Sequence, residues 1–67
     1  MKNFTQKEQE IFALMAEGLS NQEIATRLNI SIHTVKSHLL NIYEKTGIHN
    51  RIQLIIIAVK IKYNIED

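Results

Sequence analysis

The chain has no cysteine, no proline and only two glycines among its 67 residues. Without cysteine it can form neither a disulfide nor a thiolate metal site, so redox chemistry is not an expected function. Strong β-strand signals are also missing, because no alternating run adjoins an Asn-Gly or Asp-Gly turn. The sequence therefore predicts an all-α fold.

Long hydrophobic runs are absent as well. No apolar segment approaches the ~18 residues that a membrane span needs, and the first residues, "MKNFTQKEQE", lack the apolar part of a secretory signal. We therefore expect a cytoplasmic protein with no membrane partner. A chain this short allows one domain, 1–67, and buries only ~60% of the surface that its unfolded state exposes. Efficient helix packing, or a partner, is needed to stabilise it.

The net charge of +1 is small, but the charges are unevenly distributed along the chain. The four charged residues of 8–23 are all acidic, whereas those of 25–51 are four basic residues and one acidic residue. A basic region is compatible with nucleic-acid binding. Ordinary scatter of surface charge gives the same pattern, so charge alone does not decide the function.

Helix-capping signals divide the chain into short helices. The stretches "TQKE" and "SNQE" are capping boxes that open the first two helices. Gly18, Asn29 and Gly47 can adopt the left-handed conformation that ends a helix. The predicted helices are 5–18, 20–29, 31–47 and about 50–63.

The second and third helices are separated by only about three residues. This connection is too short for the two helices to lie comfortably antiparallel, and it favours a helix-turn-helix motif at about 20–40. In that motif the second helix of the pair projects into a groove of the nucleic acid, while the first crosses the backbone.

The projecting helix has an unusual outward face. With Val35 at the centre of the buried face and a step of about 100° per residue, Leu39 and Ile42 also face inward. A purely solvated face would carry mostly Glu, Lys, Gln and Arg. This one has few acids and includes a leucine; its residues are His33, Lys36, Ser37, Leu40, Asn41 and Glu44.

Side chains of this kind suit the major groove of DNA. Lys36 can donate to guanine or to a phosphate, and Asn41 can pair with the edge of adenine. Leu40 can contact a thymine methyl group, and Ser37 lets the backbone approach closely. The alternative is that Leu40 packs on the protein and Lys36 is a solvated charge. The predicted base-facing residues are His33, Lys36, Ser37, Leu40 and Asn41.

The stretch "AEGLSNQEIATRLNISIHTVKSHLLNIYEKTGIHNR", with "FTQKEQEIFALMAEG" before it, resembles the LuxR/GerE/FixJ family of bacterial helix-turn-helix regulators. The resemblance covers nearly the whole chain. It implies a four-helix LuxR-type DNA-binding domain whose third helix enters the major groove and whose fourth helix forms a two-fold dimer. Lys36 and Ser37 match groove-contacting positions of the family, and Leu40 and Asn41 match variable positions that tune sequence choice.

The same resemblance assigns phosphate-facing residues, at positions that in the family commonly face phosphates or brace the domain. These are Ser20, Asn21, Thr34, Lys45 and Arg51. The chain departs from the family pattern at four places. Gln6 and Gln9 stand where basic residues are frequent, Leu40 stands where polar or basic residues are common, and Thr46 replaces the usual leucine.

The fourth helix is apolar on two opposite sides, which a monomer of this size cannot bury together. We expect one side to face the core: Ile52, Ile55, Ile56, Val59 and Tyr63. We expect the other side to form a homodimer interface: Leu54, Ile57, Ala58, Ile61 and Ile65. The alternative is that this second side docks on another domain of a longer protein.

No pattern indicates an enzyme, a cofactor or a metal site, since the histidine spacings suit no common metal site. The sequence favours a dimeric, sequence-specific DNA-binding regulator, with double-stranded DNA and RNA polymerase as partners. The alternative is a protein-interaction module that pairs with a related regulator through its fourth helix without binding DNA. A free-standing regulator and the output domain of a longer protein both fit the sequence.

Overall fold

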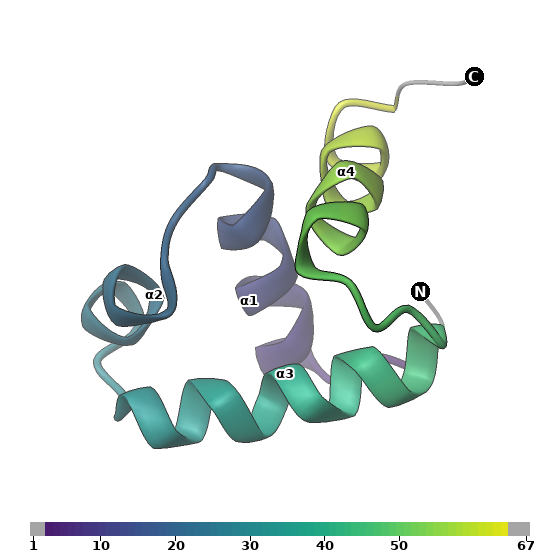
Figure 1. Cartoon of the computed structure of the whole chain (residues 1–67). Coiled ribbons are helices and arrows are strands. Elements are labelled where there is room, and N and C mark those ends of the chain that lie inside the picture. Colours follow the sequence, from purple (N-terminus) through teal and green to yellow (C-terminus); the bar gives the residue numbers. More distant parts are fainter. Residues whose placement is uncertain (1–2, 65–67) are drawn as a thin grey trace.

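A computed structural model describes residues 3–64, and every regular element in that part of the chain is a helix. The predicted all-α fold is therefore confirmed, and the predicted bounds are close (Figure 1). No helix within this part is long and apolar enough to cross a membrane. The helices are α1 (Gln6–Ala16), α2 (Asn21–Leu28), α3 (Ile32–Thr46) and α4 (Arg51–Lys62).

Both predicted capping boxes are formed. The Thr5 hydroxyl accepts from the Glu8 N–H at 3.1 Å, and the Glu8 carboxylate accepts from the Thr5 N–H at 2.9 Å. Ser20 and Glu23 make the same pair of bonds at 3.2 and 2.8 Å. These bonds satisfy N–H groups that have no partner inside the helix, and so they fix where α1 and α2 begin.

Two turns of the same design separate the first three helices. Gly18 and Asn29 adopt left-handed conformations, with φ of 85° and 56°. The apolar residue that follows each, Leu19 or Ile30, donates its N–H to a carbonyl five residues earlier, at 3.3 and 3.0 Å. A serine N-cap comes next and opens the following helix. Because each turn is this short, the chain changes direction sharply at both places.

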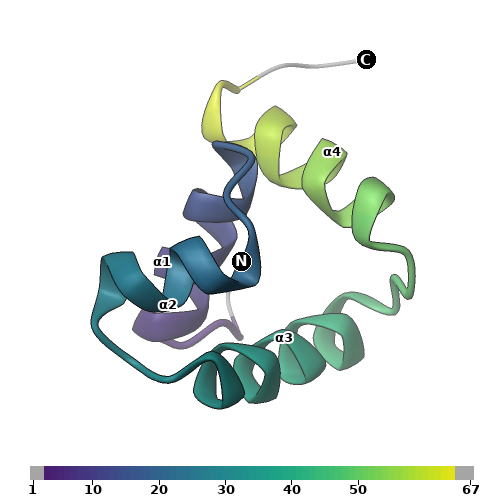
Figure 2. The same ribbon diagram turned by 60° about the vertical axis from the view of Figure 1, so that its left-hand side comes forward.

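The central element is α1, which packs against each of the other three helices. The remaining contact between helices is that of α2 with α3, the pair that forms the helix-turn-helix motif. Helix α4 leaves α3 through a loop and lies against α1 instead (Figures 1 and 2). Its Cα atoms stay more than 8 Å from those of α2 and α3.

One hydrophobic core joins the four helices. The predicted inner face of α3 is confirmed, because Val35, Leu39 and Ile42 are all buried. Thr46, which stands where the family has leucine, is half-buried and donates its hydroxyl to the Ile42 carbonyl at 2.9 Å. The buried apolar residues are Ile11, Phe12, Leu14, Met15, Ile24, Ala25, Val35, Leu39, Ile42, Leu54 and Ala58.

The predicted orientation of α4 is wrong for most of its apolar residues, although Ile55 packs against the core as expected. Leu54 and Ala58, which we expected at a dimer interface, are 0% and 2% exposed and belong to the core. Ile52, Ile56 and Tyr63, which we expected in the core, are 69%, 49% and 60% exposed. The other members of the predicted interface are Ile57, half-buried against the core, Ile61, exposed, and Ile65, which lies outside the described residues.

Polar anchors at the two ends of α4 explain the orientation. Arg51 bonds to Asn21 at 2.8 Å, and Lys62 bonds to Glu17 at 2.9 Å. Arg51 and Lys62 lie on the helix beside Ala58, so their bonds turn that side toward α1 and α2. Both apolar sides repeat with the helical period, and the period alone cannot choose between them.

A buried glutamate ties the start of α1 to the end of α3. Glu8 is 2% exposed, and its carboxylate accepts from Lys45 Nζ at 2.6 Å. Lys45 Nζ also donates to the Asn3 carbonyl at 2.7 Å and lies 5.9 Å from the centre of the Phe4 ring. The Lys45 hydrogen bond, and then the Thr5 N–H, lower the pKa of Glu8 below its ordinary value although burial opposes this.

We expect Glu8→Gln to lower the free energy of unfolding at pH 7 by about 1–3 kcal/mol, because Lys45 loses its charged partner. The folded-state pKa of Glu8 lies below its unfolded value of 4.5. The stabilisation is therefore complete above pH 4.5 and is lost as the pH falls through the folded-state pKa. Urea unfolding between pH 7 and pH 2.5 should show a flatter acid dependence for the variant. The control, Glu10→Gln, breaks a surface ion pair with Lys7 and a 3.4 Å hydrogen bond from Gln6, and should change the profile much less.

We expect Leu54→Ala to destabilise the fold by about 2–5 kcal/mol, because it leaves a cavity in the core. The matched variant Ile52→Ala truncates an exposed side chain two residues earlier in the same helix and should cost much less. Thermal unfolding at low protein concentration compares the two. A larger loss for Ile52→Ala would contradict the orientation of α4.

Candidate nucleic-acid interface

The outward face of α3 is fully accessible. Its side chains come from the first three turns of the helix and lie opposite the buried Val35 and Leu39. Leu40 is 65% exposed, which excludes the alternative that it packs on the rest of this domain. The structure thus brings the five predicted base-facing residues onto one exposed surface: His33, Lys36, Ser37, Leu40 and Asn41.

The first turn of α3 is fixed by its own hydroxyl groups. Ser31 Oγ accepts from the Thr34 N–H at 3.0 Å and lies 2.8 Å from Thr34 Oγ1. Thr34 is half-buried and its hydroxyl is paired within this turn. The pairing sets the direction in which α3 leaves the turn after α2, and with it the direction of the outward face.

A shallow groove extends this surface beyond α3. It places Asn21, at the start of α2, and Arg51, at the start of α4, beside Lys36 and Leu40. Tyr43 also lines the groove and is half-buried. Tyr43 was not among the residues predicted from the sequence to face the nucleic acid. Its position two turns after Lys36 on the same side of the helix was the available signal.

Three residues that we expected to face phosphates, Lys45, Arg51 and Asn21, have partners within the protein. Lys45 Nζ binds Glu8 on the inner side of α3. Arg51 Nη1 donates to Asn21 Oδ1 at 2.8 Å, and its Nη2 donates to the Leu19 carbonyl at 3.4 Å. Both cations thus brace the domain, which is the second role that the family resemblance allows at these positions.

The outward face therefore carries little charge. Lys36 is its one permanent cation, and Glu44, one turn beyond Leu40, contributes an opposite charge. Phosphate neutralisation by lysine and arginine supplies most non-specific DNA affinity. This surface offers few such contacts.

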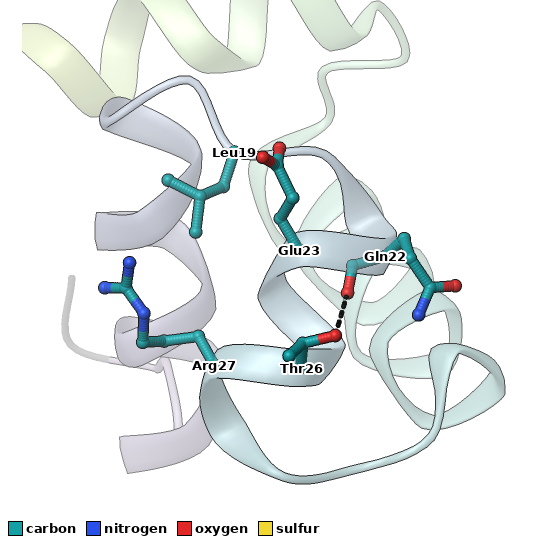
Figure 3. A pocket seen from close by; sticks show the side chains of 5 residues that line it. All are labelled: Leu19, Gln22, Glu23, Thr26 and Arg27. Carbon is teal, nitrogen blue, oxygen red and sulfur yellow. Dashed lines mark hydrogen bonds between the residues drawn. The ribbon is translucent and has the colours of Figure 1, made fainter.

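A second groove lies on the other side of α2, lined by Leu19, Gln22, Glu23, Thr26 and Arg27 (Figure 3). Its polar groups are largely used within the helix. Thr26 Oγ1 donates to the Gln22 carbonyl at 3.0 Å, and the Glu23 carboxylate accepts from the Ser20 N–H, which lowers the pKa of Glu23. The groove thus brings together few free polar groups with which to hold a ligand. Within residues 3–64, no cluster of three or more histidine or acidic side chains could hold a metal ion.

Comparison with known proteins gives one consistent result. The family described as "Bacterial regulatory proteins, luxR family" matches residues 2–58. The "Probable transcriptional regulatory protein SgaR" of Hyphomicrobium methylovorum is 41% identical over 96% of this chain. The "Monoamine regulon transcriptional regulator" of Klebsiella aerogenes is 51% identical over 76% of it. The "Response regulator protein VraR" of Staphylococcus aureus is 48% identical over 81% of it.

These relatives are much longer than the chain. The match spans 30% of SgaR, 22% of the monoamine regulator and 26% of VraR. The similarity therefore concerns one domain of each relative, and their remaining parts have no counterpart in these 67 residues.

Proposed function

The chain belongs to the LuxR family of bacterial regulatory proteins, and from this premise we propose that it binds duplex DNA as a dimeric, sequence-specific regulator of transcription. RNA polymerase is a further partner that we propose, because two relatives are named as transcriptional regulators. The proposal assigns α3 to the major groove and α4 to the dimer.

The observation that carries the proposal is the exposed leucine on α3. Leu40 is 65% exposed and is flanked on the same face by Lys36, Ser37 and Asn41. Water gives no favourable contact to a leucine, whereas the methyl groups of thymine in a major groove do. A helix fits that groove, and the residues nearest its start reach the base edges.

Each outward side chain receives a role from its chemistry. Lys36 donates to guanine O6 and N7, and Asn41 pairs with adenine N6 and N7. Ser37 and His33 contact base edges near the start of α3. The phosphate contacts are assigned, from the family resemblance, to residues at the starts of α2 and α3; these are Ser20, Asn21 and Thr34. Lys45 and Arg51 support the domain from within.

The dimer interface that we propose is the corrected one. The exposed apolar side of α4 begins at Ile52, continues through Ile56 and half-buried Val59, and ends at Tyr63. Large apolar side chains gathered on one exposed face usually mark an interface. A two-fold pairing of this face would present two copies of α3 to half-sites about 34–36 Å apart.

Selection of binding sites from random duplex DNA, with molecular mass measured alongside, tests the proposal. We expect an inverted repeat bound by two copies of the chain. If the chain forms dimers or pairs with a related regulator, yet retains no duplex even at low salt, the interaction module without DNA binding is the better description.

We expect Lys36→Ala to weaken binding to the selected duplex by about 1–3 kcal/mol per half-site if Lys36 reads a base. If it contacts only a phosphate, all duplexes should weaken alike, and the slope of log affinity against log salt should fall by about 1 for each half-site. Fluorescence anisotropy at several salt concentrations separates the two results. Lys7→Ala removes an equal charge from α1, where Lys7 pairs with Glu10, and should change neither quantity. Equal effects of the two variants would refute a role for Lys36.

We expect Ile56→Asp to convert the dimer to a monomer while leaving the fold intact, because Ile56 is 49% exposed and the aspartate remains solvated in the monomer. Sedimentation equilibrium and circular dichroism give the two readouts. Binding to a two-half-site duplex should fall more steeply than binding to one half-site, since the gain from two linked contacts is lost. A variant that is still fully dimeric would place the interface elsewhere.

A further inference from the structure

The relation between α4 and the helix-turn-helix pair rests on few direct contacts. The Cα atoms of α4 lie more than 8 Å from those of α2 and α3, and its backbone packs on α1. The connection from α3 is a short loop that starts at Gly47, in a left-handed conformation with φ of 72°, and includes exposed His49 and Asn50. Helix α4 is therefore placed relative to α3 through α1 and the shared core, without direct backbone packing between α4 and α3.

The Arg51 side chain makes direct hydrogen bonds across this separation. Arg51, the first residue of α4, donates from Nη1 to Asn21 Oδ1 at 2.8 Å and from Nη2 to the Leu19 carbonyl at 3.4 Å. Asn21 is the first residue of α2, and Leu19 lies in the turn before it. Arg51 and Asn21 are both half-buried. A planar guanidinium that donates to two acceptors resists rotation as well as separation.

We call the bonds from Arg51 to Asn21 and to the Leu19 carbonyl the clamp. The residues next to the clamp belong to the proposed dimer face and the proposed DNA-facing surface. Ile52 follows Arg51 directly and is the first residue of the exposed apolar side of α4. On the α3 side, Arg51 and Asn21 line the same groove as Lys36 and Leu40. The clamp thus lies between Ile52, at the start of the proposed dimer face, and the groove beside Lys36 and Leu40 on the proposed DNA-facing surface.

We propose that the Arg51–Asn21 pair is a positioning element that sets the distance between the two α3 helices of the dimer, and so selects the spacing of the half-sites. This inference rests on the proposed function. Arg51 acts here through the orientation of α4, without contacting a base.

The dimensions of the domain make spacing sensitive to this orientation. The molecule is 21 Å across its two shorter axes. At a distance of that size from α4, a tilt of about 10° between α4 and α3 displaces the outward face of α3 by about 3.5 Å, which is about one base-pair step. A clamp that holds the angle to a few degrees would discriminate against half-sites that are one base pair too close or too far.

The chain offers a matched control at the other end of α4. Lys62 Nζ bonds to Glu17 at 2.9 Å, and both side chains are about one-third exposed. This pair ties α4 to α1 and involves neither α2 nor α3. Glu17→Gln therefore removes an anchor of α4 without touching the clamp.

The experiment measures affinity for a set of duplexes that carry the selected half-sites at the selected spacing, and at spacings one and two base pairs shorter or longer. The proteins are the wild type, Arg51→Ala, Arg51→Lys, Asn21→Ala and Glu17→Gln, each verified as a folded dimer. We expect the wild type and Glu17→Gln to prefer the selected spacing over its neighbours by about tenfold or more, equivalent to about 1.4 kcal/mol. For Arg51→Ala and Asn21→Ala the preference should fall below about threefold, and Arg51→Lys should retain part of it.

The ratio of the affinities for two half-site spacings separates an effect on positioning from an effect on stability or on phosphate contacts. A loss of fold or of a phosphate contact lowers affinity for all spacings together and leaves the ratio unchanged. Arg51→Ala and Asn21→Ala both break the bond between these two side chains, and Arg51→Ala also removes the bond to the Leu19 carbonyl, so the double variant should relax spacing no further than Arg51→Ala alone. If Arg51→Ala does not fold, Asn21→Ala, which removes the principal acceptor and leaves Arg51 in place, decides the question through the spacing ratio.

The outcomes separate the inference from the proposed function. An unchanged spacing ratio in the Asn21→Ala dimer, or a wild type without spacing preference, overturns the inference and leaves the DNA-binding proposal standing. A wild type that retains no duplex overturns the proposed function, and the inference falls with it.

Discussion

The turn between α2 and α3 is the constraint on which the rest of the surface depends. Asn29 takes a left-handed conformation, and the N–H of Ile30 returns to the Ala25 carbonyl at 3.0 Å. The N-cap of α3 follows immediately at Ser31, so the two helices cannot run back along each other. With α2 packed on the inner side of α3, the other side of α3 has no helix to cover it, and Leu40 is left exposed.

Two basic side chains, Lys45 and Arg51, are paired within the domain, and this lowers the positive charge available on its DNA-facing surface. Lys45 neutralises buried Glu8, and Arg51 joins α4 to α2, so neither contributes freely to the DNA-facing surface. The remaining charge on the outward face of α3 is that of Lys36, opposed by Glu44. A surface with so few cations gains little from non-specific phosphate contacts. In the function that we propose, the dimer and the base-edge contacts assigned to Asn41 and Lys36 carry both affinity and sequence preference.

Local signals in the sequence were enough for the helices and for the faces of α3. Capping residues define helix ends through bonds within a few residues, as at Ser20, and only one face of α3 repeats apolar residues. The same reasoning failed for α4, because Leu54 and Ile56 lie on opposite sides that are equally apolar. Helix α4 is anchored by the bonds from Arg51 to Asn21 and from Lys62 to Glu17, whose partners lie 30 and 45 residues apart in the sequence. Side-chain bonds over that distance leave no periodic trace.

A titration of ¹⁵N-labelled protein with the duplex recovered by site selection tests the central claim most directly. The turn after α2 is held to direct the face from His33 to Asn41 into the groove. Changes in backbone amide chemical shifts should therefore be largest from Ser31 to Asn41 and at the start of α2 near Asn21, and small in the middle of α1. If the changes centred on α1 while the outward face of α3 was unaffected, the account of how this domain meets DNA would be contradicted.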